Sequence, residues 1–283
     1  MAPCLRTIVL YLAVPVLLLC SAGPSAAQTV PGSAPEARDM ALVGFHDLQG
    51  RSAYQPIIQQ QGGRFIAYIG HHGGAALNPL NGKTEPHGTS IMDVTDPTRV
   101  SEVADQLTSR FGRVDILVNN AGIARSETPA EKVADEHWLN VVDVNLNGTF
   151  WCCRAFGKHM LDAKSGSIVN IGSMSGFIVN KPQEQCYYNA SKAAVHHLTK
   201  SLAAEWGARG VRVNAVAPTY VETPLNAFVK SNPRMYDAWI GGTPMARMGT
   251  PDEIASVVLF LASDAASLMT GSVVLVDGGY TCW

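Results

Sequence analysis

The stretch Cys186–Lys192, CYYNASK, places two tyrosines ahead of one lysine. On an α-helix, residues four positions apart are separated by about 40° around the axis, whereas residues five apart differ by about 140°. Tyr188 and Lys192 are therefore expected to share a face, with Tyr187 pointing elsewhere. An ammonium group beside a phenol lowers the phenol pKa from about 10, so the pair could act as an acid/base on an alcohol or a carbonyl. This spacing alone is common in solvated helices and does not establish a site.

Further polar residues follow apolar, strand-like runs. Ser173 ends the run GSIVNIGS, where its hydroxyl could donate to a substrate oxygen or form a turn. Asn119 and Asn120 end the run VDILVNN, and Gly122 permits a tight turn after them. These are candidate site residues, because ligands bind at the carboxyl ends of strands in parallel sheets. Asn145 falls inside a helical pattern, which is unfavourable unless its side chain has a partner or bends the helix.

The elements around these residues alternate between strand and helix from about Asp93 onward. Expected helices cover residues 97–111, 136–160, 188–206 and 252–264, and expected strands cover 114–122, 166–173, 211–218 and 272–279. The first helix has Asp96 as its N-cap, Pro97 at its first position and Gly112 as its stop. Strands that are apolar throughout, alternating with helices, predict an α/β fold with a doubly wound parallel sheet.

Taken together, these motifs resemble the short-chain dehydrogenase/reductase family over about residues 93–283. NNAG, the serine after IVNI, YNASK and the stretch PTYVETP (Pro218–Pro224) stand in the family's order and spacing. The resemblance implies that Tyr188 is the general acid/base, and that Lys192 lowers its pKa and holds the nicotinamide ribose. It further implies that Ser173 orients the substrate oxygen and that Asn145 supports a water-mediated proton relay.

The same resemblance implies a nicotinamide cofactor, NAD or NADP. The implied contact positions are Asp93 and Val94 at the adenine, Asn120, Ala121 and Gly122 beside the central sheet, Tyr188 and Lys192 at the ribose, and Pro218, Val221 and Thr223. Thr223 matches the residue that binds the carboxamide. Thr219 departs from the family, which usually has glycine there, and adds a Cβ near the expected cofactor path.

Within the family, residues 172–218 and the end DGGYTCW look like polyol dehydrogenases, which interconvert sugar alcohols and ketoses. The implied reaction is hydride transfer between a secondary alcohol and the nicotinamide, and the implied partner is a small sugar alcohol or ketose. Homo-oligomers are usual among such proteins, so self-association is expected.

One expected feature of the family is missing from the sequence. The glycine-rich loop T-G-x-x-x-G-x-G, which lets the backbone approach the pyrophosphate, belongs near residues 40–50, where MALVGFHDLQG has no such pattern. The nearest candidate, Tyr68–Gly74 (YIGHHGG), precedes Asn-Pro and Asn-Gly pairs that prevent a helix, so it is interpreted as a turn. His71 and His72 lack further spaced ligands, and no metal is predicted. Catalysis is therefore expected to be impaired or absent.

The chain before this domain has a different character. Residues 1–27 have Arg6, an apolar run and then small residues, as in a secretory signal peptide, and the run is too short for a membrane span. Export is thus indicated, whereas the dehydrogenase domain suggests the cytoplasm. Residues 28–92 are predicted to be β-rich or irregular. Because the first βαβ unit is lost, an inner strand edge is exposed, and we expect poor solubility or capture by residues 28–92.

Residues 1–98 resemble the start of secreted LVIVD-repeat proteins, and DVTDP occurs in both families. A fusion at this stretch is the resulting hypothesis. The alternative function is a non-enzymatic secreted β-repeat fragment joined to a dehydrogenase remnant, although one partial repeat cannot bury its own faces.

Composition excludes some other classes. The formal net charge of −2 and the absence of basic runs argue against a nucleic-acid partner. The six cysteines form no C-x-x-C pair, and they are expected to be small buried apolar side chains.

Overall fold

The computed structural model describes residues 41–42, 58–61, 64–69, 75–77, 84–86, 94–124 and 128–283 of the chain. In this described part of the chain, seven strands form the main sheet in the order β1-β2-β3-β6-β7-β8-β9. They are β1 (Ala41–Leu42), β2 (Ile58–Gln61), β3 (Arg64–Ile69), β6 (Ile116–Asn119), β7 (Gly166–Ile171), β8 (Val211–Pro218) and β9 (Val273–Val276). The five strands from β3 to β9 in this order are parallel, and β2 and β1 extend the sheet in antiparallel pairs. The prediction of an α/β fold with a parallel sheet is confirmed.

The strand β3 comes from the part of the chain that precedes the dehydrogenase-like motifs. It pairs in parallel with β6, from Ile66↔Ile116 to Ile69↔Asn119. The edge of β6 is therefore covered by a strand from residues 28–92, which is one of the two outcomes expected for that edge. The strands β4 (Ala75–Leu77) and β5 (Thr84–Pro86) form a separate antiparallel pair, so the segment after YIGHHGG begins as a strand and not as a helix.

The first described helix, α2 (Pro97–Phe111), has the ends that its sequence predicts. The Asp96 carboxylate accepts hydrogen bonds from the backbone N–H groups of Thr98 and Arg99, at 2.9 and 3.0 Å. Gly112 ends the helix with φ of 80°, a left-handed conformation that glycine adopts without a Cβ penalty.

The helix predicted over residues 136–160 is present as three consecutive helical segments. It consists of α3 (Asp135–Val142), a π-helical turn (Asp143–Asn147) and α4 (Gly148–Asp162). The remaining helices are α5 (Cys186–Trp206), α6 (Pro233–Gly241) and α7 (Pro251–Ala262). The sequence analysis did not predict α6. The 3₁₀ turns include Met174–Gly176 after β7 and Pro224–Ser231 before α6.

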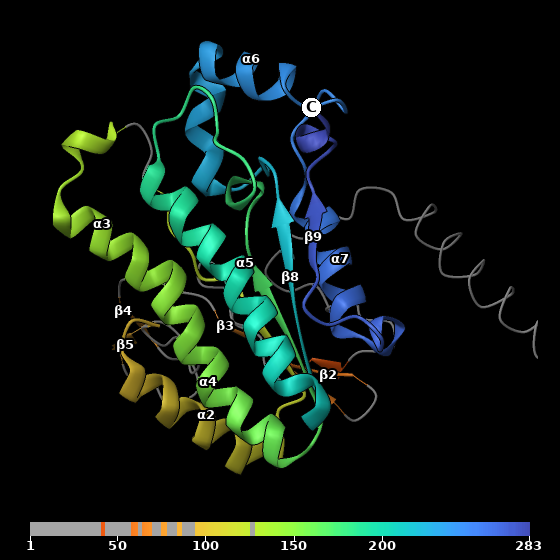
Figure 1. Cartoon of the computed structure of the whole chain (residues 1–283). Helices are drawn as coiled ribbons and strands as arrows, with labels where there is room; N and C mark the ends of the chain where they lie inside the picture. The colour runs from red at the N-terminus through yellow and green to blue at the C-terminus, as the bar shows by residue number, and fades with distance from the viewer. Residues whose placement is uncertain are drawn as a thin grey trace, which may run out of the picture. The chain divides into compact units, whose positions relative to one another are not determined.

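Helices cover both faces of the sheet, with α2, α4 and α5 on one side and α7 on the other (Figure 1). Alternate residues of β6 divide between the two layers, because successive strand side chains point to opposite faces. Leu117 packs with residues of α2, α4 and α5 such as Phe156, whereas Ile116 and Val118 pack with Leu261 of α7. Burial on both faces explains why the strands are apolar throughout.

A third apolar cluster lies where the parallel strands end. Its buried members come from the turn after β7, the end of β8, the 3₁₀ turn before α6, α6 itself and the loop before α7: Met174, Tyr220, Val229, Met235, Trp239 and Met248. The rings of Tyr220 and Trp239 stack with centroids 3.8 Å apart. The segment between β8 and α7 is thereby fixed to the carboxyl end of the sheet, where the sequence places the candidate site.

Candidate active site

The two tyrosines of CYYNASK lie in different surroundings. Tyr187 is fully buried, and its ring centroid lies 4.3 Å from that of His137 on α3. Burial raises the pKa of Tyr187, so its phenol stays protonated. Tyr188 is only half-buried, as a group that must meet a substrate requires. Of the two, Tyr188 is the one placed to exchange a proton with a ligand.

Lys192 lies one helical turn beyond Tyr188, with Nζ 5.8 Å from the centre of the Tyr188 ring. Its side chain is only 4% exposed, and Nζ donates a hydrogen bond of 2.8 Å to the carbonyl of Ile171 at the end of β7. Burial lowers the pKa of Lys192 to about 8. The ammonium group carries three N–H donors, and this bond uses one of them. A buried cation with donors to spare fits a hydroxyl-rich ligand such as a ribose.

Ser173 sits just past β7, on the same strand end that Lys192 contacts. Its Oγ accepts a hydrogen bond of 3.1 Å from the backbone N–H of Ser175, and its own backbone N–H donates to His196 Nε2 at 3.3 Å. The preceding residue, Gly172, donates its N–H to the carbonyl of Val216 on β8. The Ser173 hydroxyl therefore acts as a cap acceptor and keeps its own proton for a partner.

Asn145 is fully buried in the π-helical turn between α3 and α4. Its Oδ1 accepts from the N–H of Ile123 at 2.8 Å, and its Nδ2 donates to the carbonyl of Ile123 and to Ser191 Oγ, both at 3.0 Å. Ser191 Oγ donates in turn to the carbonyl of Tyr188. The side chain therefore has the partners that the sequence required of a mid-helix asparagine, and it lies where the helix is π-helical.

A polar network between the strand ends contains Asn119. Its Nδ2 donates to Asn170 Oδ1 at 2.8 Å and to Cys153 Sγ at 3.2 Å, and Asn170 Nδ2 donates to Thr199 Oγ1 on α5. The ends of β6 and β7 are thus held together and to the helix that carries Tyr188.

The cysteines divide into two groups. Cys152 and Cys153 are buried, and burial raises the pKa of both thiols. Cys186 and Cys282 are exposed. The expectation that the cysteines are buried small apolar side chains is therefore wrong for Cys186, the first residue of α5, and for Cys282, which ends the last 3₁₀ turn. Cys4 and Cys20 lie outside the described residues.

The expected cofactor positions in the loops after β6 and β8 gather at the same end of the sheet. Asn120, Ala121 and Gly122 follow β6 and are half-buried. A Cβ added to Gly122 would lie 3.3 Å from Lys192 Nζ and 3.5 Å from Asn145 Oδ1, so the glycine leaves open space beside the lysine. A narrow space bordered by a buried ammonium fits the ribose end of a nicotinamide cofactor.

The other expected cofactor positions have mixed placements. Pro218 is the last residue of β8, and Thr223 precedes the 3₁₀ turn that leads to α6. Val94 is buried against Gly148 of α4, so only its main chain is left to meet a ligand. The Oγ1 of Thr219 is buried and has no hydrogen-bond partner among the described residues. Asp93 lies outside the described residues, as do His71, His72 and most of YIGHHGG.

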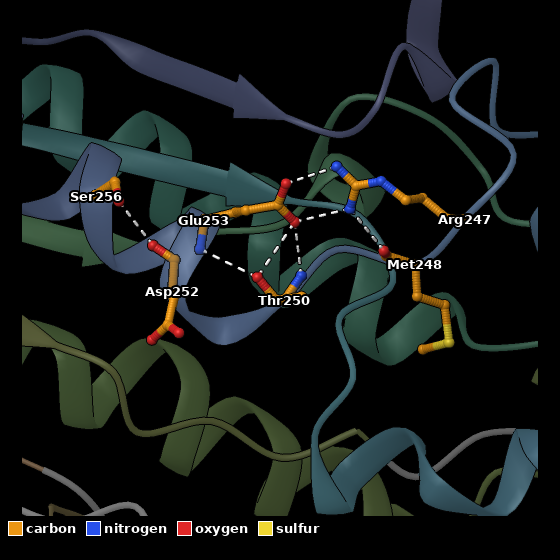
Figure 2. A network of polar contacts seen from close by, with 6 residues as sticks. All are labelled: Arg247, Met248, Thr250, Asp252, Glu253 and Ser256. Atoms are coloured by element: carbon orange, nitrogen blue, oxygen red, sulfur yellow. Dashed lines mark hydrogen bonds and ion pairs between the residues drawn. The ribbon is translucent and has the colours of Figure 1, made fainter. Parts of the chain in front are cut away.

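The segment that carries Val221 is anchored to the loop before α7. The Glu222 N–H donates to the Gly249 carbonyl, and the Gly249 N–H donates to the Tyr220 carbonyl, both at 2.9 Å. Figure 2 shows how that loop is held: the Arg247 guanidinium donates to both oxygens of Glu253, at 2.6 and 2.8 Å. Glu253 also completes a capping box with Thr250 at the start of α7. The hydrogen bond from Arg247 lowers the pKa of Glu253 to about 2.

His196 is one of the residues of this site that the sequence analysis did not single out. It lies four residues beyond Lys192 and eight beyond Tyr188, so all three share one face of α5. The i, i+4 spacing that continues from Tyr188 and Lys192 to His196 could have pointed to it. Among residues 94–124 and 128–283, no group of three or more His, Cys, Asp or Glu side chains could hold a metal ion. Within the same described residues, no helix combines the length and hydropathy needed to cross a bilayer.

The fold and site together define the class of dinucleotide-dependent α/β oxidoreductases: a parallel sheet with an acid/base pair at its carboxyl end. A family model described as enoyl-(acyl carrier protein) reductase matches residues 57–281. The chain is 60% identical over 193 residues to the galactitol 2-dehydrogenase of Rhizobium johnstonii, covering 68% of this chain and 75% of the relative. It is 50% identical to the L-tagatose-forming galactitol 2-dehydrogenase of Cereibacter sphaeroides over the same shares.

Solved structures give the same result. The crystal structure of gox2181 is 58% identical with a TM-score of 0.67, covering 68% of this chain and 75% of that one. A gluconate 5-dehydrogenase from Burkholderia cenocepacia, in complex with NADP and tartrate, is 35% identical with a TM-score of 0.66, covering 68% and 74%. The chain belongs to the short-chain dehydrogenase/reductase family, as the motifs NNAG and YNASK predicted.

Proposed function

We propose that this chain is an oxidoreductase that transfers hydride between a nicotinamide cofactor, NAD or NADP, and a polyol or its ketose. The observation that carries the proposal is the buried Lys192, which lies on one helix face with Tyr188 and is bonded to the strand end that bears Ser173. A solvated Tyr–Lys pair would have no such contact. Here the pair is fixed at the carboxyl end of the sheet.

In this proposal the chain's own residues manage the proton. For oxidation of an alcohol, the Tyr188 phenolate accepts the hydroxyl proton as the carbonyl forms, and for reduction the phenol returns it. The neighbouring Lys192 charge favours the phenolate. The Ser173 hydroxyl donates to the substrate oxygen and orients it, while Asn145 holds the loop after β6 and supports the proton relay. When bound, the nicotinamide supplies the hydride acceptor or donor, and Lys192 is placed to hold its ribose.

A polyol is the substrate class that the relatives favour. Two relatives at 60% and 50% identity are named as galactitol 2-dehydrogenases. A D-threitol dehydrogenase of Mycolicibacterium smegmatis is 44% identical over 202 residues. All three names refer to linear sugar alcohols. The preference is tested by comparing galactitol, D-threitol and sorbitol with simple secondary alcohols that lack neighbouring hydroxyls.

The phosphate end of the cofactor is where we expect this chain to be weak. The sequence lacks T-G-x-x-x-G-x-G, and without that loop and its helix N-terminus the pyrophosphate loses its usual donors. We therefore expect a high Kd for NADH and NADPH and slow turnover. Titration of the purified protein with each cofactor, followed by assays with the polyols and the corresponding ketoses, tests the function. Failure to bind either cofactor would remove the enzymatic proposal.

The alternative is a non-enzymatic secreted β-repeat fragment joined to a dehydrogenase remnant. It predicts that neither NADH nor NADPH binds in that titration.

Export is a separate proposal that rests on residues 1–27. Cell fractionation tests it, with a mature N-terminus at Gln28 as the expected product. The fusion hypothesis is tested by re-sequencing the codons for residues 85–100, and self-association by light scattering of the purified protein.

A further inference from the structure

We propose that His196 is a positioning residue for Ser173: its Nε2 accepts the Ser173 main-chain N–H and so fixes the serine hydroxyl at the end of β7. The inference rests on the proposed function, because Ser173 orients a substrate oxygen only if the chain is an oxidoreductase of this type. The contact itself is a property of the fold and can be measured without turnover.

The imidazole of His196 is built into the main chain around Ser173. The side chain is 5% exposed. A Cβ added to Gly172 would lie 2.4 Å from His196 Nε2, and one added to Gly176 would lie 2.4 Å from Cε1. Both distances are below any real Cβ contact, so the ring occupies the space that two glycines leave on either side of the serine. The Phe177 ring closes the site, with its centroid 4.5 Å from that of His196.

Two side chains from one face of α5 hold this strand end. The pairing of β6 with β7 ends at Asn119↔Asn170, and the helix supplies partners for main-chain groups further along. Lys192 Nζ donates to the Ile171 carbonyl at 2.8 Å, and His196 Nε2 accepts from the Ser173 N–H at 3.3 Å. An ammonium group only donates and a neutral imidazole nitrogen can accept, so each side chain matches the main-chain group that it meets.

The contact requires a neutral imidazole with its proton on Nδ1. Burial, together with the charges of Lys192 and Lys200, lowers the pKa of His196 to about 4. The ring is therefore neutral at neutral pH, and Nε2 can accept there. Its Nδ1 is buried and has no hydrogen-bond partner among the described residues, so the Ser173 N–H is the polar contact that the structure gives this ring.

The consequence for function concerns the serine hydroxyl. Ser173 Oγ is already oriented by the Ser175 N–H, and the backbone to which it is attached is oriented by His196. Loss of the Nε2 acceptor leaves the buried Ser173 N–H without a partner and lets the strand end move. Even a small displacement of the hydroxyl that orients the substrate reduces the rate of the chemical step much more than it affects cofactor binding.

The first test compares His196→Leu, His196→Gln and the control His197→Leu, which changes the adjacent exposed histidine. His196→Leu is expected to lower kcat about tenfold to a hundredfold, with little change in the Kd for the cofactor. His196→Gln, whose amide oxygen can replace Nε2, should recover most of the loss, and His197→Leu should change little. In a Ser173→Ala background, His196→Leu should have no further effect on kcat. Equal losses in both backgrounds, or no recovery with glutamine, would overturn the inference.

The second test does not depend on activity. Nitrogen NMR of histidine-labelled protein should show His196 with a protonated Nδ1 and an unprotonated, hydrogen-bonded Nε2 at neutral pH, and the Ser173 amide signal should move in His196→Leu. A protonated Nε2 would overturn the inference even in an active enzyme. If the wild-type chain binds no cofactor but shows this tautomer, the proposed function fails while the His196–Ser173 contact stands.

Discussion

At the scale of single residues, Tyr188 and Tyr187 form a matched pair for testing the acid/base role. Tyr188→Phe removes the hydroxyl that exchanges the proton, so kcat should fall by at least about a hundredfold while the chain still folds. Tyr187→Phe keeps the buried ring beside His137 but removes its hydroxyl, which hydrogen-bonds to Thr128, so it should keep most of the activity and lower the stability. Initial rates and urea unfolding of both variants check this. The assigned role fails if Tyr188→Phe keeps wild-type turnover.

His196 also predicts a dependence of stability on pH. Its pKa is about 4 in the folded chain and about 6.5 when unfolded, so the unfolded chain binds the proton more tightly. The stabilisation is complete above pH of about 6.5 and is lost as the pH falls toward 4, by roughly 3 kcal/mol in total. The unfolding free energy, measured with urea at several pH values in this range, should change less steeply with pH in His196→Gln than in wild type or His197→Gln. Identical slopes in all three proteins would contradict it.

The sequence predicts the chemistry-bearing residues better than their supports. The i, i+4 relation of Tyr188 and Lys192 follows from helix geometry, and the structure places both on one face with Tyr187 turned away. His196 continues the same spacing but was not singled out, because its partner is a backbone N–H of a distant strand end. A backbone donor leaves no residue type in the sequence to pair with. The positions of Asn119 and Ser173 were predictable because apolar strands end there.

At the scale of elements, the start of α7 is where local polar contacts support the site. Thr250→Ala removes the hydroxyl that accepts the Glu253 N–H, and should cost about 1 kcal/mol of unfolding free energy. Arg247→Ala removes the bidentate partner of Glu253, but both side chains are about half exposed and solvent screens the pair, so the loss should be smaller than that of Thr250→Ala. Thermal unfolding measures both, with Ser256→Ala, an exposed position on the same helix, as the control.

The same contacts predict a functional effect, because the loop before α7 is bonded to the segment that carries Val221. Arg247→Ala should therefore raise the Kd for the cofactor even under conditions in which the variant is fully folded. An unchanged Kd would mean that the Val221–Gly249 pairing alone fixes this segment.

The sequence predicts helices best where caps and apolar periods agree. The α2 boundaries at Asp96 and Gly112 are confirmed, and α5 begins only two residues before its expected start. The π-helical turn at 143–147 was not predictable, since one extra residue in a turn barely disturbs the apolar pattern of a long helix. The helix α6 was missed because it is only nine residues long and buries only Met235 and Trp239.

At the scale of the whole molecule, the sheet joins two parts of the chain with different sequence character. The sequence predicted that loss of the first βαβ unit would expose a strand edge, and that residues 28–92 could cover it. It did not predict which strand would do so or in which direction, because such pairing depends on an edge created far away in sequence. The structure assigns this position to β3, parallel to β6.

Ala67 tests that arrangement, since it pairs with Ile58 of β2 on one side and with Leu117 of β6 on the other. Ala67→Pro removes a backbone N–H from the middle of β3, and loss of that ladder bond should cost about 1–3 kcal/mol. It should also leave the edge of β6 open, so that the protein aggregates at concentrations where wild type stays dispersed. Ala67→Val, which keeps the N–H, is the control. Urea unfolding measures the loss of stability and light scattering measures the aggregation. A proline variant as stable and dispersed as wild type would show that β3 does not cover the edge of β6.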